Sequence, residues 1–260
     1  MSEYVLRLKT VQAGVFRTLI EVLKECLNDV NVTFDAKGMT ITAIDGAKVA
    51  LIDLKLYADR FEAYECVAEG DVVLGMNMGC FHKIMKTVSN TDTIELFVLA
   101  KNRNELCIVI DNPDRSLKSH FALKLLDIDD EVLTVPSVVV ESIVTMPSAD
   151  LQRLCRDMSN LGSEVDITSV GDQLTFTVEG DFAKQTTVLG EGARGISVSN
   201  NTADSKTGRF PLKYITLFTK STNLCAVVDI IIRNGYPLIL KYNVSSLGEI
   251  RYCLAPIVTC

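Results

Sequence analysis

The sequence predicts an α+β fold in which one module, made of antiparallel sheet and two short helices, occurs twice. Three observations support this prediction. Many short stretches alternate apolar and polar residues, as half-buried strands do. Only a few stretches place apolar residues three and four apart, as amphipathic helices do. Segments of the first half also match segments of the second half at a nearly constant distance along the chain. Together these features are typical of an α+β protein.

Two independent stretches carry the internal repeat. Residues 30–42 match residues 165–177 at an offset of 135, so that Val32 meets Ile167 and Met39 meets Leu174. A second match at an offset of 134 places residues 94–98 on residues 228–232. Two matches at nearly one offset argue against chance alignment. We therefore predict modules at 1–124 and 142–260, joined by an acidic linker at 125–141.

The predicted elements follow one another in the same order in both modules. Strands of the first module are expected at 4–9, 30–34, 39–44, 48–56, 93–98, 105–110 and 116–124. Its helices are expected at about 13–28 and 77–88, the second burying Phe81, Ile84, Met85 and Val88. In the second module one helix begins at Pro147 and Ser148, with Ser148 as its N-cap, and the other covers about 211–219.

Each predicted helix carries two basic residues away from its apolar side. The chain as a whole is acidic, with a net charge of −7, whereas a general nucleic-acid binder is usually basic. One helix with exposed lysines would indicate only a solvated face. Four such helices at repeat-related positions favour a surface that meets phosphate on a chain that otherwise avoids it. The pairs are Arg17 and Lys24, Lys83 and Lys86, Arg153 and Arg156, and Lys213 and Lys220.

Composition narrows the class of protein further. Hydrophobic residues make up 48% and charged residues 23% of the 260 residues, which predicts a globular chain. The longest nearly apolar run, 225–232, is far too short for a membrane helix, and the N-terminal residues lack the apolar core of a secretory signal. We therefore expect no membrane partner. The eight cysteines show no C-x-x-C spacing, so we expect reduced thiols that are mostly buried.

An enzyme is the first alternative function. Gly190-Glu-Gly-Ala-Arg-Gly195 reads G-x-G-x-x-G, but a dinucleotide site needs a helix directly after it. The residues that follow predict a strand and then a turn. Neither His82, which we place on an exposed helix face, nor His120 has partners at metal-ligand spacing. No nucleophile and base stand out, so we predict no catalysis and no metal or cofactor, with the dinucleotide-binding enzyme as a remote alternative.

Several longer stretches together point to a known family. They are Gly75-Met-Asn-Met-Gly-Cys-Phe-His-Lys-Ile-Met-Lys86, Met146-Pro-Ser-Ala-Asp-Leu-Gln-Arg-Leu-Cys-Arg-Asp157, Tyr214-Ile-Thr-Leu-Phe-Thr-Lys220 and Tyr252-Cys-Leu-Ala-Pro256. The chain resembles the eukaryotic-type DNA sliding clamp family, proliferating cell nuclear antigen. The resemblance implies the DNA clamp fold and a homotrimeric ring around duplex DNA, which acts as a processivity factor for DNA polymerase and as a docking platform for replication and repair proteins.

The resemblance also assigns roles to residues. It implies that the eight basic residues face the DNA, where contacts to phosphate alone allow sliding. It implies that neighbouring subunits pair the strand near 116–124 with the strand near 184–189, which uses two sheet edges. It makes 125–141 a connector loop on which polymerases, flap nucleases, ligases and the clamp loader dock with short peptides. The pocket for the peptide anchors would be lined by Ile44, Val49, Leu133, Val135, Pro136, Pro237, Ala255 and Pro256.

The chain departs from the family pattern at a few positions. Gly171 stands where the family has a lysine that is modified in damage tolerance, Lys48 stands where histidine is usual, and the usual acidic tail does not follow Pro256. These departures suit a divergent lineage or a large DNA virus, so we expect a nuclear location or a viral replication site. A subunit of a heterotrimeric clamp, of checkpoint or mixed type, remains the second alternative.

Overall fold

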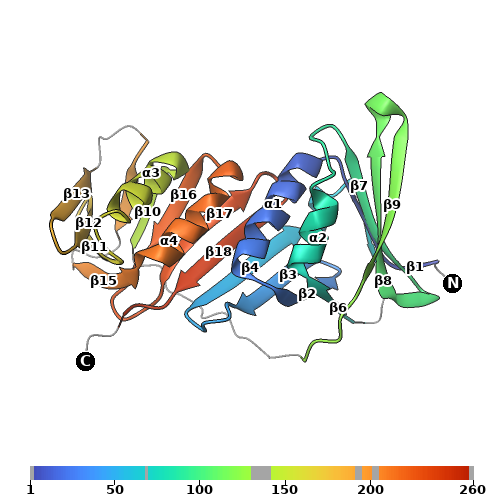
Figure 1. Cartoon of the computed structure of the whole chain (residues 1–260), viewed down its shortest axis with the longest axis horizontal. Helices are drawn as coiled ribbons and strands as arrows, with labels where there is room; N and C mark the ends of the chain where they lie inside the picture. Colours follow the sequence, from blue (N-terminus) through green and yellow to red (C-terminus); the bar gives the residue numbers. More distant parts are fainter. Residues whose placement is uncertain (1–2, 68–69, 130–141, 191–194, 201–204, 258–260) are drawn as a thin grey trace. The chain divides into compact units, whose positions relative to one another are not determined.

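A computed structural model describes residues 3–67, 70–129, 142–190, 195–200 and 205–257. The chain divides into two compact units (Figure 1). The first consists of Met1–Gly46, Asp53–Thr134 and Val244–Glu249, and the second of Ala47–Ile52, Val135–Asn243 and Ile250–Cys260. Both units combine antiparallel sheets with two α-helices, which confirms the predicted α+β class. No helix in the described ranges is both long and apolar enough to cross a membrane.

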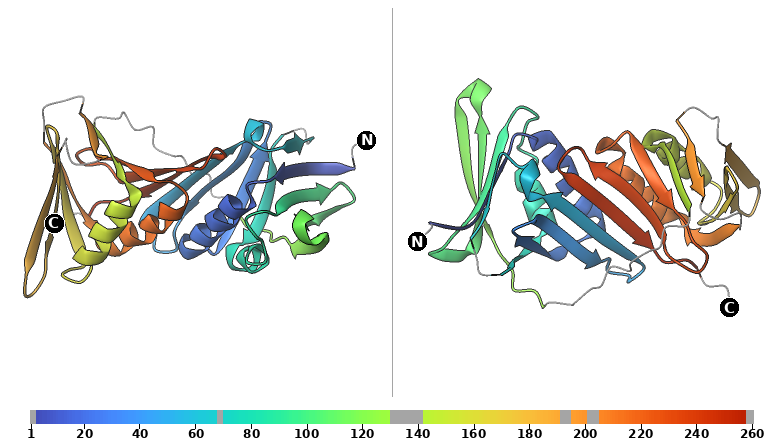
Figure 2. Two further views of the ribbon diagram at one scale, coloured as in Figure 1. Left: turned by 90° about the horizontal axis from the view of Figure 1, so that it is seen from above. Right: turned by 180° about the vertical axis from the view of Figure 1, so that it is seen from behind.

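The first unit holds a five-stranded sheet and a group of four strands. The five strands lie in the order β5-β1-β7-β8-β9, and the four in the order β4-β3-β2-β6. Helices α1 and α2 lie side by side on one face of the second group (Figures 1 and 2). The bounds are β1 Tyr4–Thr10, α1 Ala13–Cys26, β2 Asp29–Asp35, β3 Gly38–Ile44, β4 Ala50–Tyr57, β5 Ala63–Cys66, β6 Val72–Asn77, α2 Met78–Met85, β7 Thr93–Leu99, β8 Asn102–Asn112 and β9 Leu117–Lys124, with short 3-10 turns η1 Ala58–Arg60 and η2 Pro113–Arg115.

The second unit follows the same plan. Its strands form a four-stranded sheet in the order β13-β12-β11-β15 and a group in the order β14-β10-β16-β17-β18. Helices α3 and α4 pack on the same face of the latter group (Figures 1 and 2). The bounds are β10 Ser142–Pro147, α3 Ser148–Met158, β11 Glu164–Val170, β12 Gln173–Glu179, β13 Lys184–Gly190, β14 Ser197–Asn200, β15 Lys206–Pro211, α4 Leu212–Phe218, η3 Thr219–Asn223, β16 Val227–Ile231, β17 Leu238–Val244 and β18 Gly248–Leu254.

The repeat seen in the sequence is also a repeat in backbone pairing. In the hairpin of β2 and β3, Thr33 lies opposite Thr40. In the hairpin of β11 and β12, Thr168 lies opposite Thr175, and both positions differ from the first pair by the offset of 135. The same register arises because both hairpins bury the same alternate residues, such as Val32 and Ile167.

Each core lies between helices and sheet. In the first unit the buried ring of Phe16 on α1 meets that of Phe81 on α2 at a centroid distance of 6.3 Å. In the second, Phe218 of α4 stacks on Tyr252 of β18 at 4.5 Å, and the Tyr252 hydroxyl bonds Ser221 at 2.7 Å. Burying one such ring stabilises a fold by roughly 1.5–3 kcal/mol. The helix faces opposite these rings are therefore fixed by the core.

Several local predictions are wrong. Strands β5 and β6 were not predicted, since one is short and Gly75 interrupts the alternation of the other. Ile84 of α2 is half-buried rather than buried. Ser148 is not an N-cap: it is the first residue of α3, and its hydroxyl donates to the Cys225 carbonyl at 2.6 Å. Seven cysteines are described and form no disulfide, but among these seven, full burial is seen only for Cys155 and Cys253, contrary to expectation.

Candidate nucleic-acid interface

Helix α2 presents the clearest basic surface of the first unit. Lys83 and Lys86 are both exposed, because the apolar side of α2 faces the core through Phe81 and Met85. The helix contains no acidic residue. No acidic side chain within the helix itself offsets these lysines, which suits contact with phosphate.

Helix α1 differs, although it carries two of the predicted residues. Lys24 is half-buried and forms an ion pair with Glu25 at 2.8 Å. Arg17 is also half-buried, and its guanidinium donates to the Val88 carbonyl at 2.6 Å and to the Asn90 side chain at 3.0 Å. With Glu21 exposed on the same helix, the positive charge of α1 is balanced.

The second unit shows the same contrast between its two helices. On α3, Arg153 and Arg156 are exposed, but Asp150 and Asp157 share this helix, and Arg153 pairs with Asp150 at 3.2 Å. Such an exposed pair contributes little and can exchange for phosphate. The segment of α4 and η3 contains Lys213 and Lys220, both exposed, and no acidic residue. The second helical segment of each unit is thus the more positive one.

The Lys213 side chain has a further contact. Its ammonium lies 5.0 Å from the centroid of the Tyr214 ring, within the range of a cation–π interaction. Tyr214 is itself almost fully buried. The contact draws the lysine toward the surface of α4 without removing its charge.

The prediction that His82 lies on an exposed helix face is wrong. His82 is 6% exposed and not on an exposed face; α2 packs against α1, and charged residues of α1 lie close enough to act on the imidazole. Burial, then the positive charges of Lys24 and Lys86, lower its pKa below 6.5, against weaker opposing effects of Glu21 and Glu25. The imidazole is therefore neutral near pH 7, and a proton added there would lie among cations.

This pKa predicts how stability depends on pH. Below about pH 6.5 the unfolded chain binds a proton at His82 before the folded chain does, so acidification favours unfolding. We expect the free energy of unfolding of the wild type to fall relative to that of His82→Gln from about pH 7 to pH 5, by at most about 1.4 kcal/mol per pH unit. Urea unfolding at several pH values measures the difference. Parallel pH profiles would show that His82 does not contribute.

The structure describes five of the eight residues predicted for a peptide pocket, and their role stays a prediction. Val49 and Ala255, in the second unit, are adjacent, since the Ala255 amide donates to the Val49 carbonyl at 3.0 Å. Pro237 and Pro256, in the same unit, are half-buried. Ile44 ends β3 in the first unit and is 37% exposed. Three further predicted residues lie outside the described residues, namely Leu133, Val135 and Pro136.

Residues 125–128, where the predicted connector begins, are fixed to the first unit by three hydrogen bonds. The amide of Leu125 donates to the Asn104 carbonyl at 2.9 Å, and that of Leu126 to the Gly75 carbonyl at 2.8 Å. The Asn31 side chain donates to the Ile128 carbonyl at 3.1 Å. A Cβ on Gly75 would lie 2.3 Å from the Leu126 carbonyl oxygen. This anchor was not predicted, although a glycine within a strand is a known signal for close backbone approach.

Two long strands lie at sheet edges. Within the described residues, β9 pairs only with β8 and β13 only with β12. Beside β13, a cavity of about 440 Å³ has an apolar lining of Met146, Leu154, Leu189 and Ile196 and a charged one that includes Asp150, Arg153 and Asp157. Leu117 on β9 and Val188 on β13 are more than half exposed. Exposed edges with apolar side chains are sites for pairing with another chain.

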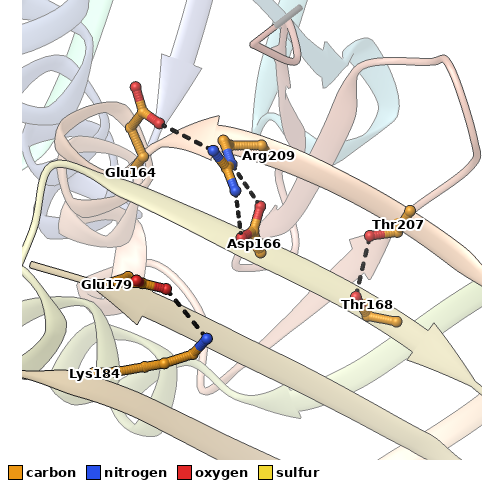
Figure 3. A network of polar contacts seen from close by, with 7 residues as sticks. All are labelled: Glu164, Asp166, Thr168, Glu179, Lys184, Thr207 and Arg209. Carbon is orange, nitrogen blue, oxygen red and sulfur yellow. Dashed lines mark hydrogen bonds and ion pairs between the residues drawn. The ribbon is translucent and has the colours of Figure 1, made fainter. Parts of the chain in front are cut away.

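Cross-strand polar contacts hold the sheet that ends in β13 (Figure 3). Arg209 of β15 donates two hydrogen bonds to Asp166 of β11, at 2.7 and 2.9 Å, and this contact raises the pKa of the guanidinium. The hydroxyls of Thr168 and Thr207 lie 3.1 Å apart. Each of these pairs is directly opposite in the strand register. They fix the register of the sheet on its exposed face.

The structure argues against the dinucleotide site. Strand β13 ends at Gly190, and β14 begins at Ser197. Residues 191–194 lie outside the described part, but the segment that follows Gly195 is a strand and not the helix that the motif needs. Among the residues with described positions, no three His, Cys, Asp or Glu side chains could hold a metal ion together.

Comparison with known proteins agrees with this architecture. Residues 5–132 match the model of the N-terminal domain of proliferating cell nuclear antigen, and residues 134–257 match that of its C-terminal domain. The chain is similar to the "Probable DNA polymerase sliding clamp 1" of Paramecium bursaria Chlorella virus 1, with 35% identity over 256 residues that cover 97% of each chain. The chain belongs to the proliferating cell nuclear antigen family.

Proposed function

We propose that this chain is a DNA polymerase sliding clamp, a ring that encircles duplex DNA and keeps the polymerase on its template. The observation that carries the proposal is the exposed lysines of α2 and of the α4–η3 segment, which contain no acidic residue, on a chain with a net charge of −7. Lysines on rigid helices meet phosphate without reading bases, so the contact is independent of sequence. An acidic remainder repels DNA, which leaves the ring to hold by its topology.

The ring is proposed to be a homotrimer. In support, two of the edge strands among the described residues, β9 and β13, are long and lie on two different units. Two different edges that pair between copies give a head-to-tail contact, and such contacts generate a closed ring where the rotation between neighbours closes. A heterotrimeric clamp would use the same edges with other subunits. Under this proposal 1–124 and 142–260 are the two modules and 125–141 is the connector.

The connector is the proposed docking site for polymerase, flap nuclease, ligase and clamp loader. Leu126, Asp127 and Asp129 are exposed, so the described part of the connector offers an exposed apolar side chain followed by two exposed acidic ones. Buried aromatic and aliphatic anchors carry most of the energy of such peptide contacts. We propose that the protein acts where DNA is replicated, in the nucleus or at a viral replication site.

Retention on closed DNA tests the function. A clamp loader and ATP would place the chain on a nicked circular duplex, and the complex would be washed in about 0.5 M salt, which screens phosphate contacts. We expect the chain to stay on the circle and to leave once the circle is cut. Loss from both circular and linear DNA, for a chain that the loader does engage, would contradict encirclement.

The anchor of residues 125–128 predicts an effect on peptide binding. Gly75→Ala places a methyl group against the Leu126 backbone, which cannot yield as a side chain does. Asn31→Ala removes one hydrogen bond to Ile128. We expect a synthetic peptide with aromatic and aliphatic anchors to bind about threefold to tenfold more weakly to Asn31→Ala, and still more weakly to Gly75→Ala.

Isothermal titration would measure this affinity, with Gly46→Ala as the control. Gly46 lies near Ile44, but a Cβ added there meets no atom within 4 Å. The peptide should bind this control as it binds the wild type. Equal affinity for all three variants would show that the anchor does not position the docking site.

A further inference from the structure

Arg17 was predicted to face DNA, but its guanidinium is already engaged within the first unit. It donates to the Val88 carbonyl at 2.6 Å and to Asn90 Oδ1 at 3.0 Å. Asn90 also lies tight against α1, since a Cβ on Gly14 would be 2.5 Å from its Oδ1. Helix α1 therefore holds the loop 88–92 that follows α2 at two places.

The same loop contains a buried carboxylate. Asp92 is 2% exposed, and its Oδ2 accepts the Ser89 amide at 2.7 Å. Its Oδ1 accepts the side-chain amide of Asn112 at 2.6 Å. A buried carboxylate is tolerated where its oxygens are hydrogen-bonded in this way. Asp92 thus joins the loop to the end of β8.

Asn112 completes the connection to the sheet edge. Its Oδ1 accepts the Arg115 amide at 2.9 Å and so caps η2. Ser116 then takes a left-handed conformation with φ of 49°, and β9 begins at Leu117, which lies opposite Asn112 in the register. A chain of side-chain and backbone contacts runs from α1 to the first residue of the edge strand.

We propose that Arg17, Asn90, Asp92 and Asn112 form a brace that positions the start of β9 for pairing with a second copy of this chain. Arg17 then acts mainly by positioning the assembly edge β9, and not by binding phosphate. The inference deepens the proposed ring and rests on it only for the role of β9 in assembly. The brace itself belongs to a single chain.

The brace has a physical purpose at this place. The turn from β8 to β9 includes a residue with positive φ that is not glycine, and such a conformation must be held by its surroundings. An edge strand has hydrogen bonds on one side only, so its end frays unless the turn is fixed. Loss of the brace should therefore loosen β9 from its beginning, while the strands away from it keep their protection.

Two variants and one matched control test the proposal. Arg17→Lys keeps the positive charge but cannot reproduce the forked contact, and Asp92→Asn removes the acceptor charge of the brace. Arg7→Gln is the control, because Arg7 is also a half-exposed arginine of the first unit with two acidic partners, Glu95 and Glu65, and it does not touch the brace.

Amide hydrogen exchange of the dilute chain is the first readout. We expect both brace variants to raise exchange at Leu117–His120 about tenfold, and Arg7→Gln to leave it unchanged. In sedimentation equilibrium we expect the ring dissociation constant to rise at least tenfold for the brace variants. Because Arg17→Lys keeps the positive charge, we expect the salt dependence of DNA binding to stay as in the wild type.

Wild-type exchange at Leu117–His120 in Arg17→Lys would overturn the brace. So would equal loosening by Arg7→Gln, since that would show a general loss of stability. If the wild type stays monomeric at every concentration, the proposed ring fails, yet the exchange measurement still decides whether the brace exists. If Asp92→Asn does not fold, Asn112→Ser replaces it and should loosen β9 in the same way.

Discussion

Neutralising the four lysines of α2 and the α4–η3 segment should remove most of the affinity of the ring for duplex DNA. The variant changes Lys83, Lys86, Lys213 and Lys220 to Gln. Each phosphate contact that is lost should lower the slope of log K against log salt by about 0.9. The two segments contain no acidic residue, so the variant removes all of their lysine charge, and we expect the affinity at about 50 mM salt to fall at least a hundredfold.

The measurement is fluorescence anisotropy of a labelled duplex between about 50 and 200 mM salt, a range in which phosphate contacts change affinity strongly. The matched control changes four exposed cations outside the α-helices to Gln, namely Lys37, Arg60, Lys101 and Arg103. It alters net charge by the same amount and should lower affinity far less. Equal losses for both variants would mean that the ring responds to total charge and not to the helical lysines.

The contrast between helices gives the same experiment a second comparison. Lys24→Gln together with Arg153→Gln removes cations that already have acidic partners, Glu25 and Asp150. We expect a smaller loss per residue than for the α2 and α4–η3 lysines, because Glu25 and Asp150 already offset the charge of these two cations, which therefore attract phosphate less strongly.

Much of this architecture follows from the sequence because it depends on local periodicity. The repeated hairpins, with Val32 and Ile167 inside, and the stripes of α1 and α3 are set by which alternate residues are apolar. Strand β6 was not predicted, because its local periodicity is interrupted. Gly75 has no side chain to mark a face, and its use depends on Leu126, which is distant in sequence.

For the candidate site, the sequence predicts which residues are exposed cations, but not the contacts that these residues make. Exposed cations such as Lys83 and Lys213 follow from helical spacing. The engagement of Arg17 does not, because its acceptors lie on the loop 88–90 and the spacing of α1 carries no information about that loop. His82 was misplaced for a similar reason: one helix considered alone gives an exposed face where a neighbouring helix covers it.

Placing a carboxylate on either proposed assembly edge should reduce the ring to monomers. Leu189→Asp introduces the charge on β13, beside the cavity lined by Leu154 and Ile196. Phe121→Asp introduces the charge on β9, where the Phe121 side chain is half-buried. An unpaired charge buried between chains costs about 3 kcal/mol or more, which raises a dissociation constant at least a hundredfold.

Light scattering after size exclusion measures the result at micromolar concentration. Three wild-type chains of 28.6 kDa give a ring of about 86 kDa, and each variant should elute as a single chain. Val170→Asp is the control, since Val170 is 48% exposed on β11, a strand that is paired on both sides. It should assemble as the wild type does.

Mixing the two edge variants distinguishes a head-to-tail ring from any other assembly. The Leu189→Asp chain keeps an intact β9, and the Phe121→Asp chain keeps an intact β13, so the mixture has one good contact and no way to close. We therefore expect a dimer of two 28.6 kDa chains, about 57 kDa, that appears only on mixing. A mixture that stays monomeric, although the wild type is a trimer and both variants are folded, would show that β9 and β13 are not the pair that joins neighbours. A mixture that forms full trimers would show that the carboxylates do not lie between chains at all.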